Sequence, residues 1–132
     1  MNQLPVVAVV NTNPDLVELL KARIEAAGFV VLILHIKDIR KGLDLEAVLE
    51  QHDPRVIVYD VVMPYERNWR FLEHLRATSF AGLKFVFTTP NAQGLKELIG
   101  RNDRVYEIID DRGDIDAIVQ AVREAARSRL GD

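Results

Sequence analysis

The sequence predicts a doubly wound α/β domain, with five parallel strands and helices on both faces of the sheet. Short apolar runs rich in β-branched residues alternate with segments that carry apolar residues at helical spacing. The connections between these segments are short, as expected of βαβ units. A chain of 132 residues, of which 48% are hydrophobic, is large enough for one domain with its own core. We therefore expect a single domain over residues 1–132, with the flavodoxin-like strand order 2-1-3-4-5.

The first strand and helix are marked by several local signals. Residues 6–10 form a continuous run of Val and Ala, which predicts a strand buried on both faces. Asn13 can cap the helix that follows, Pro14 suits its first turn, and Gly28 ends it. The apolar residues that share one face of this helix, and are predicted to point inward, are Leu16, Leu19, Leu20, Ile24 and Ala27.

The remaining elements follow from the same alternation. The other strands are predicted at residues 29–34, 55–60, 85–88 and 105–109, with the run at 29–34 also expected to be buried. A short helix with Leu45, Val48 and Leu49 stops before Pro54. The helix after the third strand reaches about Thr78. Gly94 weakens the helix after the fourth strand, and Asp114 caps the last helix.

The composition excludes several classes of site and function. The chain has no cysteine, which rules out disulfide frameworks, thiolate metal sites and cysteine nucleophiles. The 17 basic and 20 acidic residues are interspersed without a basic stripe, which argues against direct binding of nucleic acid. The N-terminus lacks the features of a signal peptide, and the longest apolar runs are too short to span a bilayer. We therefore expect a cytoplasmic protein without membrane contact.

One edge of the predicted sheet collects polar side chains. Ligands of an open parallel sheet bind beyond the carboxyl ends of its strands, where the strand order reverses. The polar residues delivered to this edge are Asn11, Thr12, Asp60, Thr88, Thr89 and the pair at 110–111. Asp60 stands out because it ends a run of apolar residues, where a charge is costly unless it is solvated, hydrogen-bonded or used. A lone carboxylate at a strand end can simply cap a loop or helix, so its neighbours decide its interpretation.

These residues follow the pattern of a known family. Asp60 is followed by two residues and then by Met63-Pro64, Thr88 ends the fourth strand, and the aromatic Tyr106 lies in the fifth. The opening of the first helix, at residues 13–20, is also typical. Along nearly its whole length, the chain resembles the receiver domain of two-component response regulators.

The resemblance implies a specific chemistry. Asp60 would accept a phosphoryl group from a phosphohistidine and become an acyl phosphate, and Thr88 and Tyr106 would respond as phosphate-contact and switch residues. In this family, an acidic pair after the first strand holds Mg²⁺ together with the acceptor, and a Lys after the fifth strand binds the phosphoryl oxygens. Phosphoryl transfer depends on such positioning and on neutralising the charge of these oxygens.

The sequence departs from the family at the residues that supply this charge. Asn11 and Thr12 replace the acidic pair, so the metal site loses about two of its three negative charges. We expect no cofactor, or weak binding of Mg²⁺ with Asp60 as a ligand. Tyr65 stands where the family has a glycine after the Met-Pro pair.

The Lys of the family is missing as well. Counting back from Asp114 places Asp111 at its position, whereas counting forward from Tyr106 places Ile109 there. An aspartate in place of a cation opposes formation of the acyl phosphate by a few kcal/mol, that is, about twice the roughly 1–3 kcal/mol of one charge pair. Three arginines could compensate but are expected to be solvated on the surface: Arg67, Arg70 and Arg112.

These substitutions favour an atypical receiver, or pseudo-receiver, over a phosphorylated one. We predict a signalling domain that is not an enzyme and that binds protein partners independently of phosphorylation. The expected partners are a histidine kinase, a downstream signalling protein or a second copy of the chain. The alternative keeps Asp60 as a phosphoacceptor for a histidine kinase. A nucleotide-binding or flavodoxin-like enzyme is disfavoured because no glycine-rich phosphate loop follows any strand.

Two surfaces are candidates for partner binding. Tyr65 and Trp69 lie just beyond Met63-Pro64, and Tyr, Trp and Arg are favoured in interfaces. The rival is the usual receiver interface of the fourth helix, fifth strand and fifth helix, with Leu95, Leu98, Tyr106 and Ile118 at its edges. The three histidines have no ligand spacing and are expected on the surface: His35, His52 and His74.

Overall fold

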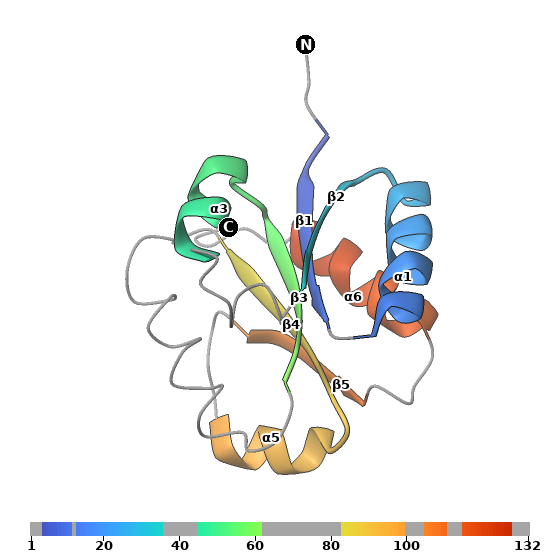
Figure 1. Ribbon diagram of the computed structural model, residues 1–132. Coiled ribbons are helices and arrows are strands. Elements are labelled where there is room, and N and C mark those ends of the chain that lie inside the picture. The colour runs from blue at the N-terminus through green and yellow to red at the C-terminus, as the bar shows by residue number, and fades with distance from the viewer. Residues whose placement is uncertain are drawn as a thin grey trace.

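The protein forms a five-stranded parallel sheet with the strand order β2-β1-β3-β4-β5 (Figure 1). We describe a computed structural model, which defines residues 4–11, 13–35, 45–61, 83–99, 105–110 and 115–127. Helices flank the sheet, so the predicted doubly wound fold class and strand order are confirmed. Among the described residues, no helix is long and apolar enough to cross a membrane.

The element bounds agree with the predicted alternation to within a few residues. The elements are β1 (Val6–Asn11), α1 (Pro14–Ala26), β2 (Val30–His35), α3 (Leu45–His52), β3 (Val56–Asp60), β4 (Lys84–Thr89), α5 (Ala92–Ile99), β5 (Val105–Asp110) and α6 (Ile115–Arg127). The predicted helix up to Thr78 and the capping role of Asp114 lie outside the described residues.

Helix α1 begins and ends where the sequence predicts. The Asn13 side chain accepts hydrogen bonds from the backbone N–H groups of Asp15 and Leu16, at 3.0 and 3.3 Å. These bonds satisfy donors that the first helical turn leaves without a partner. After Ala27, the chain turns at Gly28 with a φ of 100°, which favours glycine over residues with a Cβ.

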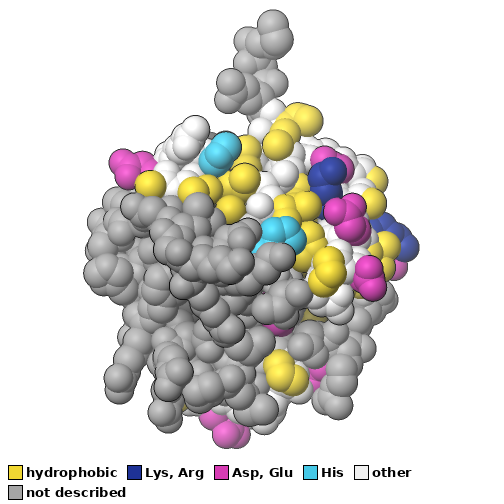
Figure 2. Space-filling model, viewed as in Figure 1, with side chains coloured by type: hydrophobic (Ala, Val, Ile, Leu, Met, Phe, Trp, Pro, Cys, Tyr) yellow, Lys and Arg dark blue, Asp and Glu magenta, His cyan; other side chains and the backbone are white. Residues whose placement is uncertain are grey.

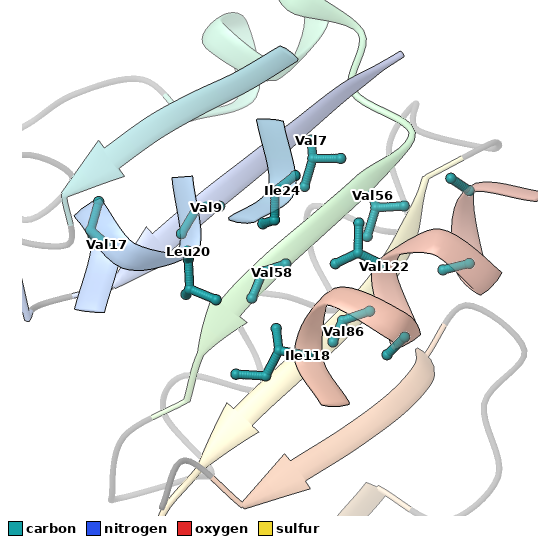
Figure 3. Packing of buried hydrophobic residues seen from close by; sticks show 13 residues of the cluster. Val7, Val9, Val17, Leu20, Ile24, Val56, Val58, Val86, Ile118 and Val122 are labelled. Carbon is teal, nitrogen blue, oxygen red and sulfur yellow. The ribbon is translucent and has the colours of Figure 1, made fainter. Parts of the chain in front are cut away.

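The sheet separates two hydrophobic cores. On one face, Val7, Val9, Val56, Val58 and Val86 pack against α1 and α6, as Figure 3 shows. On the other face, alternate residues of the same strands pack with Leu95 of α5 and Val48 of α3. Because neighbouring residues of a strand point to opposite faces and both faces are covered, the middle of each central strand is apolar, and polar residues stand at the strand ends.

Two predictions about burial are wrong. Leu19 of α1 is 46% exposed, whereas Val17 is buried with Leu20 and Ile24. The buried stripe therefore runs through positions 17, 20 and 24, and Leu19 lies outside it. The strand at residues 29–34 was expected to be buried, but β2 is an edge strand and is only partly covered, with Val30 45% exposed.

The helix after β4 contains a glycine with a structural role. Asn91 precedes α5, and its side-chain oxygen accepts a hydrogen bond from the Gly94 backbone N–H at 3.0 Å. A Cβ added at Gly94 would lie 2.8 Å from the Asn91 side-chain nitrogen. Gly94 lowers the intrinsic helix propensity, as the sequence indicates, but it also leaves room for the cap.

Candidate functional site

A row of side chains crosses the sheet at the carboxyl ends of the strands. The register pairs Asn11 with His35, Asp60 with Thr88, and Thr88 with Ile109. Asn11 and Asp60 directly follow a paired Val10 and Tyr59 on adjacent strands. We call these five residues the carboxyl-edge row; they are His35, Asn11, Asp60, Thr88 and Ile109. Laterally paired residues of parallel strands point to the same face, so the row extends the core that α1 and α6 cover.

Asp60 lies in this row as a buried carboxylate. The residue is 6% exposed, and its Oδ1 accepts a hydrogen bond from the Thr88 hydroxyl at 3.0 Å. Thr88 is fully buried. A buried carboxylate is costly without hydrogen bonds, and a donor to a charged group contributes more than a donor to a neutral one. The adjacency of Asp60 and Thr88 that the sequence predicts is present.

Asn11 stands on the other side of Asp60 and is also buried, at 3% exposure. Its side-chain oxygen accepts a hydrogen bond from the Asn13 backbone N–H at 2.8 Å. The Asn13 side chain in turn caps α1. The turn from β1 into α1 is therefore held by two neutral amide side chains. Thr12, the second residue at the acidic-pair position, lies outside the described residues.

Further hydrogen bonds fix the chain where it leaves β3 and β4. The Val61 backbone N–H donates to the Thr88 carbonyl at 2.8 Å, and the Thr89 hydroxyl donates to the Val61 carbonyl at 3.0 Å. Thr89 is fully buried. These bonds hold Asp60 and Thr88 level with each other.

The fifth strand brings an apolar residue into the row. The ladder pairs Phe85 with Val105 and Val86 with Glu107, and it skips Tyr106, as a β-bulge does. Beyond this shift, Ile109 lies beside Thr88 and is partly buried against the core under α6. Of the two predicted positions for the family's Lys, Ile109 is thus level with the row. Asp111 lies outside the described residues, as does the side chain of Tyr106.

The side chains of the carboxyl-edge row do not provide the set of oxygen ligands that a dedicated Mg²⁺ site needs. Mg²⁺ is bound through oxygen ligands, usually one or two carboxylates beside a phosphate. Of the five residues of the row only Asp60 is acidic, and it already accepts from Thr88. Within the described residues, no group of three or more His, Asp or Glu side chains could hold a metal ion.

Comparison with solved structures identifies the architecture. The chain superposes on a response regulator from Thermotoga maritima with a TM-score of 0.75, at 16% identity over 96% of this chain and 100% of that one. The fold is that of a receiver domain. A CheY-like receiver domain protein from Methanospirillum hungatei gives a TM-score of 0.73 at 17% identity, covering 95% of both chains.

A third solved structure, described as a transiently phosphorylated switch in bacterial signal transduction, gives a TM-score of 0.69. It is 18% identical over 95% of this chain and 96% of that one. No protein-family profile and no curated protein matches the sequence. At these identities the likeness shows the fold alone and assigns no role to the residues of the site.

The predicted partner surfaces are only partly covered by the structure. Tyr65 and Trp69 lie outside the described residues. On the rival surface, Leu98 is 43% exposed, but Leu95 and Ile118 are buried, so their predicted place at a surface is wrong. On the face shown in Figure 2, Lys and Arg side chains of the described residues lie beside Asp and Glu, with apolar side chains scattered among them.

The register adds His35, which the sequence did not place at the site, and it selects Ile109 from the two positions considered for the Lys. His35 was expected on the surface, and Ile109 was considered only as a position for a Lys. Both join the row because they are paired with Asn11 and Thr88 in the ladder. The signal in the sequence was the end of each apolar run, but strand ends alone do not reveal lateral pairing. His52 is exposed, as predicted, and His74 lies outside the described residues.

Proposed function

We propose that the chain is a two-component receiver domain of the pseudo-receiver type, acting as a cytoplasmic protein-interaction module independently of phosphorylation and without enzymatic activity. The observation that carries the proposal is the carboxyl-edge row. It retains the acceptor position, Asp60, and its neighbour Thr88, but the flanking side chains are neutral or apolar: Asn11 on one side and Ile109 on the other.

The charges in the row explain why phosphorylation is disfavoured. A phosphoryl group adds about −1.5 to −2 charges at neutral pH, which must be balanced by cations near Asp60. Ile109 supplies none, and Asn11 supplies one neutral amide. His35 is the one basic side chain in the row, and it lies two strands from Asp60, about 10 Å at the usual strand spacing.

In this proposal Asp60 and Thr88 stabilise the edge of the sheet. Their side-chain hydrogen bond links β3 to β4. The two hydrogen bonds of the Val61 backbone, with the Thr88 carbonyl and the Thr89 hydroxyl, link the strands one residue further along. A partner protein would then recognise a constitutive surface. The proposed partner is a histidine kinase, a downstream signalling protein or a second copy of the chain.

The alternative function retains Asp60 as a phosphoacceptor for a histidine kinase. It is favoured by the Thr88 hydroxyl, which lies 3.0 Å from the carboxylate oxygen and could turn toward a phosphoryl group. A site of this kind needs cations from outside the described residues.

A ligand titration separates the two functions. Mg²⁺ and beryllium fluoride, a mimic of the phosphoryl group, are added while thermal unfolding and the fluorescence of the single tryptophan are followed. We expect neither ligand to bind. A ligand that binds only the native state raises the melting temperature, so the melting temperature should stay unchanged. Stabilisation by both ligands that disappears in Asp60→Asn would overturn the pseudo-receiver proposal and support the alternative.

A restoring variant tests the physical reason directly. Asn11→Asp with Thr12→Asp rebuilds the acidic pair, and an Asp at position 11 keeps the acceptor for the Asn13 N–H. We expect Mg²⁺ to stabilise this variant by about 1.4 kcal/mol at roughly ten times its Kd. Asn91→Asp is the control for an added carboxylate, because it makes one of these changes, Asn to Asp, at the cap of α5. An equal response of variant and control would show that the lost charges do not explain the missing metal site.

A further inference from the structure

A second polar region lies at the opposite edge of the sheet from Asp60. A cavity of about 370 Å³ opens at the amino edge, where the chain enters its strands. Pro5, Phe29 and Arg55 line it, and each stands one residue before a strand. The C-terminal part of α6 completes the wall with Arg123 and, in the last turn, Arg127. We call this cavity the arginine pocket.

The walls of the arginine pocket are fixed by hydrogen bonds between elements. The Val30 backbone N–H donates to the Pro5 carbonyl at 3.0 Å, and the Arg55 backbone N–H donates to the Val6 carbonyl at 2.9 Å. The Arg55 guanidinium donates through Nη1 to the Ala126 carbonyl at 3.3 Å, which holds it against the end of α6. The pocket is therefore formed before any ligand arrives, a common property of small-molecule sites.

The charge of the pocket has one sign. The residues that line it include three arginines and no aspartate or glutamate, although the chain as a whole has a net charge of −3. Within the described part of the chain, Arg55, Arg123 and Arg127 form no ion pair with an acidic side chain. Like charges that face one cavity repel one another, and an anion between them relieves this repulsion.

Stabilisation of the α6 terminus accounts for only part of this arrangement. Arginines near the carboxyl end of a helix interact favourably with its dipole, which explains Arg123 and Arg127. The Arg55 guanidinium caps the same helix end through Nη1, at the Ala126 carbonyl, and Phe29 packs against the core under α1 and α6. Neither contact supplies a negative charge to balance the three arginines that line the cavity. Guanidinium groups bind carboxylate and phosphate through bidentate hydrogen bonds. Three arginines beside an apolar wall therefore suit an oxyanion that is attached to an apolar group.

We propose that the arginine pocket binds a small organic anion, a phosphate monoester or carboxylate whose apolar part rests on Phe29. The three guanidinium groups hold the oxyanion, and Pro5 and Phe29 exclude water from the apolar part. The volume lies at the lower end of the roughly 300–1,000 Å³ of ligand sites, which limits the ligand to about the size of one ring with its charged group. The site is independent of phosphorylation at Asp60.

The test is a calorimetric titration of the full chain, without Mg²⁺, with phenyl phosphate, inorganic phosphate and phenol. We expect saturable binding of phenyl phosphate at one site, weaker binding of inorganic phosphate and none of phenol. The affinity falls as salt is raised, because the arginines are exposed. No saturable binding of phenyl phosphate, or equal affinity for inorganic phosphate, would overturn the proposal.

Two double variants locate the site. Arg123→Gln with Arg127→Gln removes two exposed guanidinium groups, and we expect the affinity for phenyl phosphate to fall about tenfold or more. Lys21→Gln with Lys96→Gln removes the same charge from α1 and α5 outside the pocket and should leave the affinity unchanged. Circular dichroism checks that both variants are folded. An equal loss in both, or a loss in Asp60→Asn, would place binding elsewhere and refute the assignment.

Discussion

The two edges of the sheet treat charge in opposite ways. At the carboxyl edge, Asp60 is buried, hydrogen-bonded by Thr88 and flanked by the neutral Asn11. At the amino edge, Arg55, Arg123 and Arg127 are exposed around an open cavity. Buried polar groups affect stability through the partners they would lose, whereas exposed charges affect it little and act mainly on ligands. In the two proposals made above, the edge that carries the receiver pattern therefore contributes to stability, and the opposite edge binds a ligand.

The largest loss of stability is expected when the Thr88 hydroxyl, which donates a hydrogen bond to Asp60, is removed. Thr88→Val keeps the shape of the side chain and removes the donor to a buried carboxylate, so it should lower the free energy of unfolding by about 1.5–3 kcal/mol in urea denaturation. Thr89→Val is the matched control, because its buried hydroxyl donates to a neutral carbonyl and should cost about 0.5–1.5 kcal/mol.

The same pair can be tested for the role of charge. In an Asp60→Asn background, Thr88→Val should cost less than it does in the natural protein, because the acceptor no longer carries a charge. If Thr88→Val and Thr89→Val cost the same in every background, the carboxylate does not determine the stability of this edge.

A smaller effect is expected in the turn from β1 into α1. Asn13→Ala removes the acceptor for the backbone N–H groups of Asp15 and Leu16, and it should destabilise the protein by about 1 kcal/mol. Asn13→Asp retains an acceptor and should be nearly neutral. The comparison is made by chemical denaturation, and equal losses in the two variants would contradict the capping role.

The smallest effect on stability is expected at the amino edge. Arg127→Gln should cost about 0.3–1 kcal/mol by weakening the interaction with the end of α6, and the difference should shrink at high salt. Lys96→Gln, in the last turn of α5, provides a comparison at a helix end outside the arginine pocket. A loss as large as that of Thr88→Val would remove the contrast between the two edges.

Sequence reasoning reached the fold and the centre of the site for physical reasons. The central strands are apolar on both faces, so their runs are unbroken and their ends are visible, which placed Asn11, Asp60 and Thr88 at one edge. It was wrong about Leu19 because many residues of α1 are apolar, so that more than one face is plausible. It was also wrong about the burial of β2, because an apolar run does not tell an edge strand from a central one.

Long-range placement was beyond the sequence. Arg55 and Arg127 are 72 positions apart in the sequence (127 − 55 = 72), and each looks like an ordinary surface arginine. Only the wrapping of α6 back across the start of β3 brings them to one cavity. The same holds for His35, which joins the carboxyl-edge row through its lateral pairing with Asn11.

The skipped residue in β5 has a consequence for comparing this chain with others by sequence. A ladder that passes over Tyr106 contains one residue more than a regular pairing would use. An alignment without a gap, made to a chain whose fifth strand pairs regularly, therefore matches different structural positions on the two sides of Tyr106. This offset affects the two counts that were used to find the position of the family's Lys. The count forward from Tyr106, which gives Ile109, starts at the register shift, whereas the count back from Asp114, which gives Asp111, starts beyond it. Equivalent positions at the end of β5 are better assigned by their neighbours on β4, Thr88 and Thr89, than by their distance along the chain.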